Sequence, residues 1–89
     1  MKVLKFGAAW CPGCLIMQPL WAELEKENSW LETASYDYDE APEAVARWGV
    51  EEKLPLFIFL DKNNQEFLRL KGEISKKKLL EVLRENQDK

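Results

Sequence analysis

The sequence predicts a single α/β domain in which a central four-stranded mixed sheet is covered by three helices on its two faces. Short apolar segments and amphipathic segments follow one another in the order strand, helix, strand, helix, strand, strand, helix. Two strand–helix–strand crossovers and one hairpin in that order produce a mixed sheet. The chain has 89 residues, of which 46% are hydrophobic and 33% are charged. A chain of this length can form one hydrophobic core but not two.

The first strand and the first helix are expected at residues 3–8 and 12–28. Residues 3–8 are mostly apolar and too few for a helix, which favours a buried strand. Pro12 suits the first position of a helix, and apolar side chains recur after it with a period near 3.6 residues. Pro19 lies inside this helix and removes one backbone hydrogen bond, so we expect a kink there. The expected buried face consists of Leu15, Ile16, Leu20 and Leu24.

The middle of the chain predicts a second strand and a short second helix. Residues 34–39 alternate small or aromatic side chains with polar ones, which is the period-two pattern of a strand. Pro42 begins a short helix that turns Val45 and Trp48 toward the core. Gly49 is expected to end this helix as its C-terminal cap.

The last third of the chain predicts a hairpin followed by a helix. Leu56–Leu60 is wholly apolar, which is typical of a strand buried on both faces. Turn residues and a further short strand, Glu66–Lys71, complete the hairpin. Ser75 is expected to cap a helix whose apolar stripe consists of Leu79, Leu80, Val82 and Leu83. Residues 85–89 are polar and expected to fray, so the single domain occupies residues 1–89.

Composition excludes several classes of function. The net charge is -3 and no basic stripe runs through the folded part, so nucleic acid is not expected as a partner. No apolar run approaches the roughly 20 residues of a membrane helix. The chain has no histidine, and two cysteines cannot supply the four ligands of a structural zinc site, so we expect neither metal nor cofactor. Lys5 interrupts the apolar N-terminal stretch, which argues against a secretory leader and favours the cytoplasm. We also expect a monomer with no membrane partner.

The chemistry of the chain concentrates at Cys11 and Cys14, where the first strand leads into the first helix. A thiol at the first turn of a helix lies in the partial positive charge of unpaired backbone N–H groups, which stabilises its thiolate. We therefore expect Cys11 to be the nucleophile and to be partly exposed. Cys14, one turn further along the same face, can resolve a mixed disulfide on Cys11. An inert pair or a small structural disulfide is the alternative interpretation.

Taken together, these motifs resemble the thioredoxin fold over nearly the whole chain. In thioredoxins, a strand that ends in Ala-x-Trp-Cys-x-x-Cys leads into a helix with a proline eight residues after the first cysteine. Ala8, Trp10, Cys11 and Pro19 have that spacing here. The later family positions follow in order as Asp39, Pro42, Gly49, Val50, Pro55, Gly72 and Ser75, with one extra residue between Val50 and Pro55. The resemblance implies a thiol–disulfide oxidoreductase that acts on protein disulfides and is reduced by an upstream thiol reductase.

Three departures from thioredoxins limit what the resemblance implies. The chain resembles the shorter core that thioredoxins share with glutaredoxins. The dipeptide Pro12-Gly13 reverses the thioredoxin order and places proline first, as in glutaredoxins. Lys5 stands where thioredoxins usually carry a buried acid, and its cation should favour the thiolate and make the protein a better oxidant. We expect Lys5, Trp10, Pro12 and Gly13 to tune the dithiol; alternatively, Lys5 reaches solvent and has no effect.

The resemblance also predicts the substrate groove. It implies a cis peptide bond before Pro55, which would expose backbone groups of Leu54 for strand-like pairing with a substrate. Gly72 and Trp10 are expected beside it. Glutaredoxins carry Thr-Val before this proline and a Gly-Gly pair with an acid beyond the hairpin, which this chain lacks, so protein disulfides are favoured over glutathione adducts. A glutathione-dependent glutaredoxin, a non-enzymatic peptide-binding module and a metallochaperone remain as alternatives.

Overall fold

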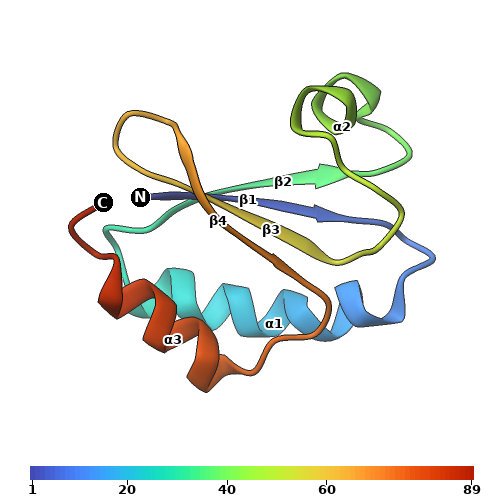
Figure 1. The fold of residues 1–89 in the computed structure, drawn as a ribbon. Helices are drawn as coiled ribbons and strands as arrows, with labels where there is room; N and C mark the ends of the chain where they lie inside the picture. The colour runs from blue at the N-terminus through green and yellow to red at the C-terminus, as the bar shows by residue number, and fades with distance from the viewer.

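A computed structural model describes residues 1–89 and contains the seven predicted elements in the predicted order (Figure 1). Their bounds are β1 (Lys2–Gly7), α1 (Pro12–Glu27), β2 (Glu32–Asp37), α2 (Pro42–Trp48), β3 (Leu56–Leu60), β4 (Glu66–Lys71) and α3 (Lys76–Glu85). No helix among them has the length and apolar content needed to cross a membrane.

The four strands form one mixed sheet in the order β2-β1-β3-β4. Strand β1 pairs in parallel with β2 and antiparallel with β3, and β4 pairs antiparallel with β3. The ends of β1, β2 and β4 therefore meet the beginning of β3 at one edge of the sheet. We call this the carboxyl edge, marked by the row of paired residues Tyr36, Phe6, Leu56 and Lys71.

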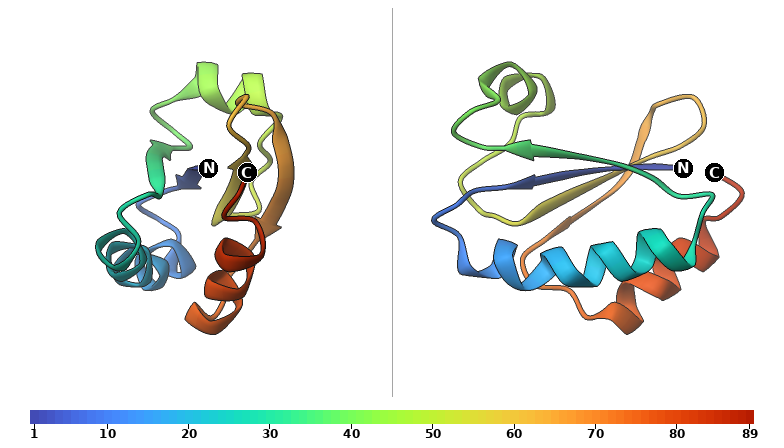
Figure 2. Two further views of the ribbon diagram at one scale, coloured as in Figure 1. Left: turned by 90° about the vertical axis from the view of Figure 1, so that its left-hand side faces the viewer. Right: turned by 180° about the vertical axis from the view of Figure 1, so that it is seen from behind.

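The helices divide between the two faces of the sheet, as predicted. Helices α1 and α3 lie side by side against one face, and α2 covers the other (Figure 2). The larger core lies on the α1 and α3 side, where Val3, Phe57 and Phe59 pack against Trp21 and Leu79. A smaller core on the α2 side contains Leu4, Phe6, Val50, Leu56, Ile58 and Leu60. Strand β3 is buried along its whole length, which confirms its prediction as a strand buried on both faces.

The buried face of α1 differs from the predicted one. Leu15 and Ile16 are each 55% exposed, so their assignment to the core is wrong, whereas Leu24 is buried and Leu20 packs at the margin of the core. The buried side chains are Cys14, Met17, Trp21 and Leu24. The first half of α1 is almost continuously apolar, so several phases of a 3.6-residue stripe fit it, and packing against the sheet selects one. The helix continues across Pro19 (Figure 1).

Local signals predicted two helix ends correctly, whereas β2 lies two residues earlier in the chain than predicted. Gly49 ends α2 in the left-handed conformation with φ 61°, as a C-terminal cap requires. The Ser75 hydroxyl accepts a hydrogen bond from the Lys78 backbone N–H at 3.1 Å and caps α3. Strand β2 begins at Glu32, two residues before the predicted start, because its pairing with β1 extends to Lys2.

Helices α1 and α3 are also tied together by charge. The Lys76 ammonium donates to Glu23 at 3.0 Å and to Glu27 at 3.1 Å, both on α1. These two hydrogen bonds raise the pKa of Lys76 above its usual value. Beyond α3 the chain folds back in a turn, with the Lys89 ammonium 4.7 Å from the centroid of the Phe67 ring. Fraying of residues 85–89 stays a prediction.

Candidate active site

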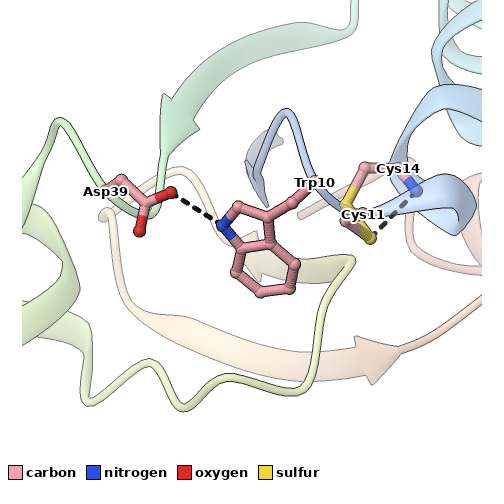
Figure 3. The surroundings of a disulfide bond; sticks show 4 residues. All are labelled: Trp10, Cys11, Cys14 and Asp39. Carbon is pink, nitrogen blue, oxygen red and sulfur yellow. Dashed lines mark hydrogen bonds between the residues drawn. A yellow bond between two sulfur atoms is a disulfide. The ribbon is translucent and has the colours of Figure 1, made fainter.

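A disulfide between Cys11 and Cys14 lies at the start of α1, at the carboxyl edge of the sheet (Figure 3). The Cα atoms of the pair are 5.3 Å apart. Cys11 is the N-cap residue of α1, and its Sγ accepts a hydrogen bond from the Cys14 backbone N–H at 3.2 Å. Pro12 occupies the first helical turn, where its missing N–H costs no helical hydrogen bond. The first turn itself carries no acidic residue, and the positive end of the helix is directed at the Cys11 sulfur.

Both cysteines are buried to the same degree. Cys11 is 6% exposed and Cys14 is 8% exposed, so the expectation that Cys11 is the more accessible of the two is wrong. Both cysteines form a buried cluster with Ala8, and Tyr38 and Leu54 pack against this cluster. A difference in reactivity between the two thiols must therefore come from the electrostatics of the helix terminus.

Two glycines allow the cysteines to lie close to their surroundings. A Cβ atom on Gly7 would come within 3.2 Å of Cys14 Sγ, so glycine at the end of β1 makes room for this sulfur. A Cβ atom on Gly13 would come within 3.3 Å of both Pro55 Cδ and Glu73 Cγ. Gly7, Tyr38 and Glu73 are neighbours that were not predicted from the sequence, although Gly7 ends a strand and Glu73 directly follows a predicted groove residue.

The predicted groove residues come together beside the disulfide. The Leu54-Pro55 peptide bond is cis, as the family resemblance implied. Gly72 has φ 82°, a conformation that favours glycine, and its backbone N–H donates to the Pro55 carbonyl at 2.7 Å. Leu54 itself packs against the cluster that contains both cysteines. The segments before β3 and after β4 thus border the disulfide together.

Trp10 is held beside the cysteines by a carboxylate from another loop. Its indole Nε1 donates to Asp39 Oδ2 at 2.7 Å, as Figure 3 shows, and the ring is 56% exposed. Asp39 is held in turn because its backbone N–H donates to Asp37 Oδ1 at 2.8 Å. The sequence motif contained Asp39 but gave no signal that it would bind Trp10, since 29 positions separate the two residues.

Lys5 points into the layer between the sheet and α1, as predicted. Its Nζ lies 3.3 Å from Glu25 Oε2 and 5.7 Å from the centroid of the Trp21 ring. Glu25 also accepts a hydrogen bond from the Thr33 hydroxyl. The Lys5 side chain is 16% exposed, so it does not extend freely into solvent. About 16 Å of helix axis separates Cys14 from Glu25, so the ion pair holds the cation toward the far end of α1.

A cavity of about 500 Å³ lies between α1 and the ends of β1 and β2. Cys14 lines it, and so do Lys5, Trp21 and Pro55. The indole N–H of Trp21 is buried and has no hydrogen-bond partner within the protein. No group of three or more His, Cys, Asp or Glu side chains is arranged to hold a metal ion.

Comparisons with known proteins agree with this geometry. Residues 1–85 match the family model described as Thioredoxin. Thioredoxin H5 of Oryza sativa subsp. japonica is 44% identical over 70 residues, which cover 79% of this chain and 50% of the rice protein. Thioredoxin-like protein slr1139 of Synechocystis sp. is 37% identical over 84 residues, 93% of this chain and 75% of that protein. The X-ray structure of Fasciola hepatica thioredoxin superposes with a TM-score of 0.85 at 33% identity, covering 96% of this chain and 79% of the other. The chain thus spans about half the length of several curated relatives that it matches.

Proposed function

The chain belongs to the thioredoxin family, and we propose that it is a thiol–disulfide oxidoreductase that reduces or exchanges disulfides in protein substrates. The observation that carries this proposal is the Cys11–Cys14 pair, placed at the N-terminus of α1 and bordered by cis-Pro55. This arrangement combines a stabilised thiolate, a second thiol one turn away and a backbone segment that can align a substrate.

In the first step, the reduced Cys11 thiolate attacks one sulfur of a substrate disulfide. A bond forms between Cys11 Sγ and that sulfur, the substrate S–S bond breaks, and the other substrate sulfur leaves as a thiolate that takes up a proton. The Cys14 backbone N–H donates to Cys11 Sγ and, with the helix terminus, stabilises the attacking charge.

In the second step, Cys14 attacks Cys11 Sγ in the mixed disulfide. The Cys11–Cys14 disulfide forms, and the remaining substrate sulfur is released as a thiolate and protonated. In total, two electrons and two protons pass from the protein dithiol to the substrate disulfide. Cys14 must lose its own proton before it attacks, and the cavity beside its sulfur provides space through which water can accept that proton.

The groove around cis-Pro55 is proposed to align the substrate. Leu54 precedes the cis bond at the surface of the cysteine cluster, where its backbone can pair with an extended substrate segment in the manner of an added strand. Gly72, hydrogen-bonded to the Pro55 carbonyl, and the exposed ring of Trp10 border the same groove.

The residues around the dithiol are proposed to tune its redox behaviour. Pro12 and Gly13 set the turn between the cysteines, and Trp10 is anchored against it by Asp39. Lys5 favours the thiolates by Coulomb attraction, but Glu25 neutralises much of its charge. We therefore assign Lys5 a small effect on the reduction potential.

The cellular setting is part of the proposal. We propose a monomer that acts in the cytoplasm as an electron carrier, is reduced by an upstream thiol reductase and requires no bound cofactor. Disulfide-containing proteins are the proposed substrates, in preference to glutathione adducts, because Leu54 precedes the cis-proline and a single glycine follows β4.

Insulin reduction with dithiothreitol as the electron source tests this function. We expect the protein to accelerate precipitation of the insulin B chain, and the Cys11→Ser variant to show only the rate of dithiothreitol alone. No acceleration by the parent protein would favour a non-enzymatic peptide-binding module with the same fold. Faster reduction of a glutathione mixed disulfide than of insulin would favour a glutaredoxin.

A further inference from the structure

Glu73, the first residue after Gly72, lies against the loop that carries the disulfide. Its Cγ is 3.3 Å and its Oε1 3.6 Å from the position of a Cβ atom on Gly13. Pro55 Cδ is 3.3 Å from the same position. The carboxylate, the turn between the two cysteines and the cis-proline therefore converge at one point of the groove.

The Glu73 carboxylate is exposed and has no cationic partner. The ion pairs of the protein join Lys5 to Glu25, Arg69 to Glu66, and Lys76 to Glu23 and Glu27. None of them includes Glu73, and no hydrogen bond to its side chain is formed. Asp39 differs, because its Oδ2 already accepts the Trp10 indole N–H. Glu73 thus has its full hydrogen-bonding capacity available to a bound substrate.

We propose that Glu73 is a specificity-determining residue that favours disulfides flanked by lysine or arginine. This inference rests on the proposed oxidoreductase function. A substrate segment that aligns along Leu54 and Pro55 passes the Glu73 carboxylate, and a basic side chain next to the reacting cysteine pairs with it. An acidic side chain at the same place meets a like charge and is disfavoured.

The other charges near the groove do not cancel that of Glu73. Asp39 is engaged by the Trp10 indole N–H and lies on the side of the Trp10 ring that faces away from the cysteines (Figure 3). Exposed Glu51 and Glu52 precede the cis-proline segment and are followed by a single cation, Lys53. Lys71 ends β4 next to Gly72 but is in no ion pair with Glu73.

The test uses two synthetic peptides that share one intramolecular disulfide and differ only in the residues next to its cysteines, lysine in one and glutamate in the other. Each peptide oxidises the fully reduced protein in a stopped-flow instrument, with tryptophan fluorescence as the signal. Because a neighbouring lysine makes a disulfide more reactive toward any thiolate, each rate is divided by the rate of the same peptide with glutathione. We expect a normalised preference for the lysine peptide of about two- to fivefold, the range of exposed ion pairs.

Three variants and one salt condition make the test specific. In Glu73→Gln the preference should fall to about one, and in Glu73→Lys it should reverse. In the matched control Glu32→Gln, an exposed glutamate at the opposite end of the sheet, the preference should remain. High salt should reduce the preference of the parent protein toward one, because salt screens exposed charges.

The two possible failures are distinguishable. Equal normalised rates for both peptides in the parent protein, or a preference that persists in Glu73→Gln, would overturn the role of Glu73 while leaving the oxidoreductase function intact. If neither peptide oxidises the reduced protein, the proposed function itself is overturned, and the inference with it.

Discussion

Helices α1 and α3 lie side by side on one face of the sheet, and each begins with the same kind of N-cap hydrogen bond. The effect of this hydrogen bond differs between the two helices. In each, the N-cap side chain accepts a hydrogen bond from the backbone N–H three residues later. The Cys11 Sγ to Cys14 N distance is 3.2 Å, and the Ser75 Oγ to Lys78 N distance is 3.1 Å. A hydroxyl is a favoured helix cap, whereas a neutral thiol is a weak acceptor.

The difference shows that the N–H groups at a helix N-terminus can stabilise a reactive thiolate instead of the helix itself. Ser75 stabilises α3 at any pH at which proteins fold, because its hydroxyl stays neutral. Cys11 becomes a strong acceptor only when it is a thiolate, so the N–H groups at the start of α1 stabilise the reactive charge more than the helix. The same backbone geometry therefore serves stability in one helix and nucleophile activation in the other.

The largest expected effect is that of Cys11→Ser, which converts the reactive cap into an ordinary one. Insulin reduction should fall to the rate of dithiothreitol alone, because serine does not attack disulfides. The reduced variant should be as stable as the reduced parent, or more stable by up to about 1 kcal/mol in urea unfolding, because serine is a favoured cap. Turnover above background would show that Cys11 is not the nucleophile.

The second prediction concerns the resolving thiol. Cys14→Ser removes the sulfur that completes the reaction. A substrate should therefore remain attached to Cys11 through a mixed disulfide. Mass spectrometry should detect a stable mixed disulfide with a cysteine-containing peptide, which dithiothreitol reverses. Cys11→Ser serves as the control and should trap much less; equal trapping by both variants would contradict the assigned roles.

The third prediction separates the two thiols of the reduced protein by alkylation with iodoacetamide. Since both cysteines are equally buried, only the cap position of Cys11 distinguishes them. Cys11 should react first, and its advantage over Cys14 should grow as the pH falls below about 8.5, the pKa of a free thiol. Peptide mapping measures both rates. Equal rates at every pH would contradict the activation of Cys11 by the helix terminus.

The fourth prediction concerns Ser75, the N-cap residue of α3. Ser75→Ala should lower the free energy of unfolding by about 1 kcal/mol, the usual effect of a lost helix cap, and leave insulin reduction unchanged. Ser75→Asp, which restores a capping oxygen, should recover most of the stability. Chemical denaturation of the oxidised protein provides the measurement; no loss in Ser75→Ala would mean that this contact contributes nothing.

The smallest expected effect is that of Lys5→Met. Because Glu25 already pairs with Lys5, removing the cation should make the protein more reducing by no more than ~10 mV, well under 1 kcal/mol for a two-electron couple. Lys5→Asp, measured in parallel, replaces the cation by an acid and should shift the reduction potential further in the same direction. Equilibration with a dithiothreitol buffer measures both, with Lys2→Met as the control on the same strand. A shift above ~30 mV in Lys5→Met would show that Glu25 does not offset the cation.

Much of the fold followed from local signals in the chain. Pro12, Gly49 and Ser75 marked helix ends correctly because caps and prolines act through the backbone of adjacent residues. The wholly apolar run Leu56–Leu60 similarly located the buried central strand. The cysteine pair was placed correctly at a helix start for the same reason.

The sequence by itself thus determined the order of the elements, the helix ends that caps and prolines mark, and the position of the dithiol. Only the tertiary structure decided which face of α1 is buried, that Lys5 pairs with Glu25, and that Glu73 meets Gly13 and Pro55. Caps and periodicity depend on residues a few positions apart, so they can be recognised along the chain. A helix face in an almost continuously apolar segment, or a contact between distant loops, depends on which surfaces the sheet brings together, and no local pattern specifies that.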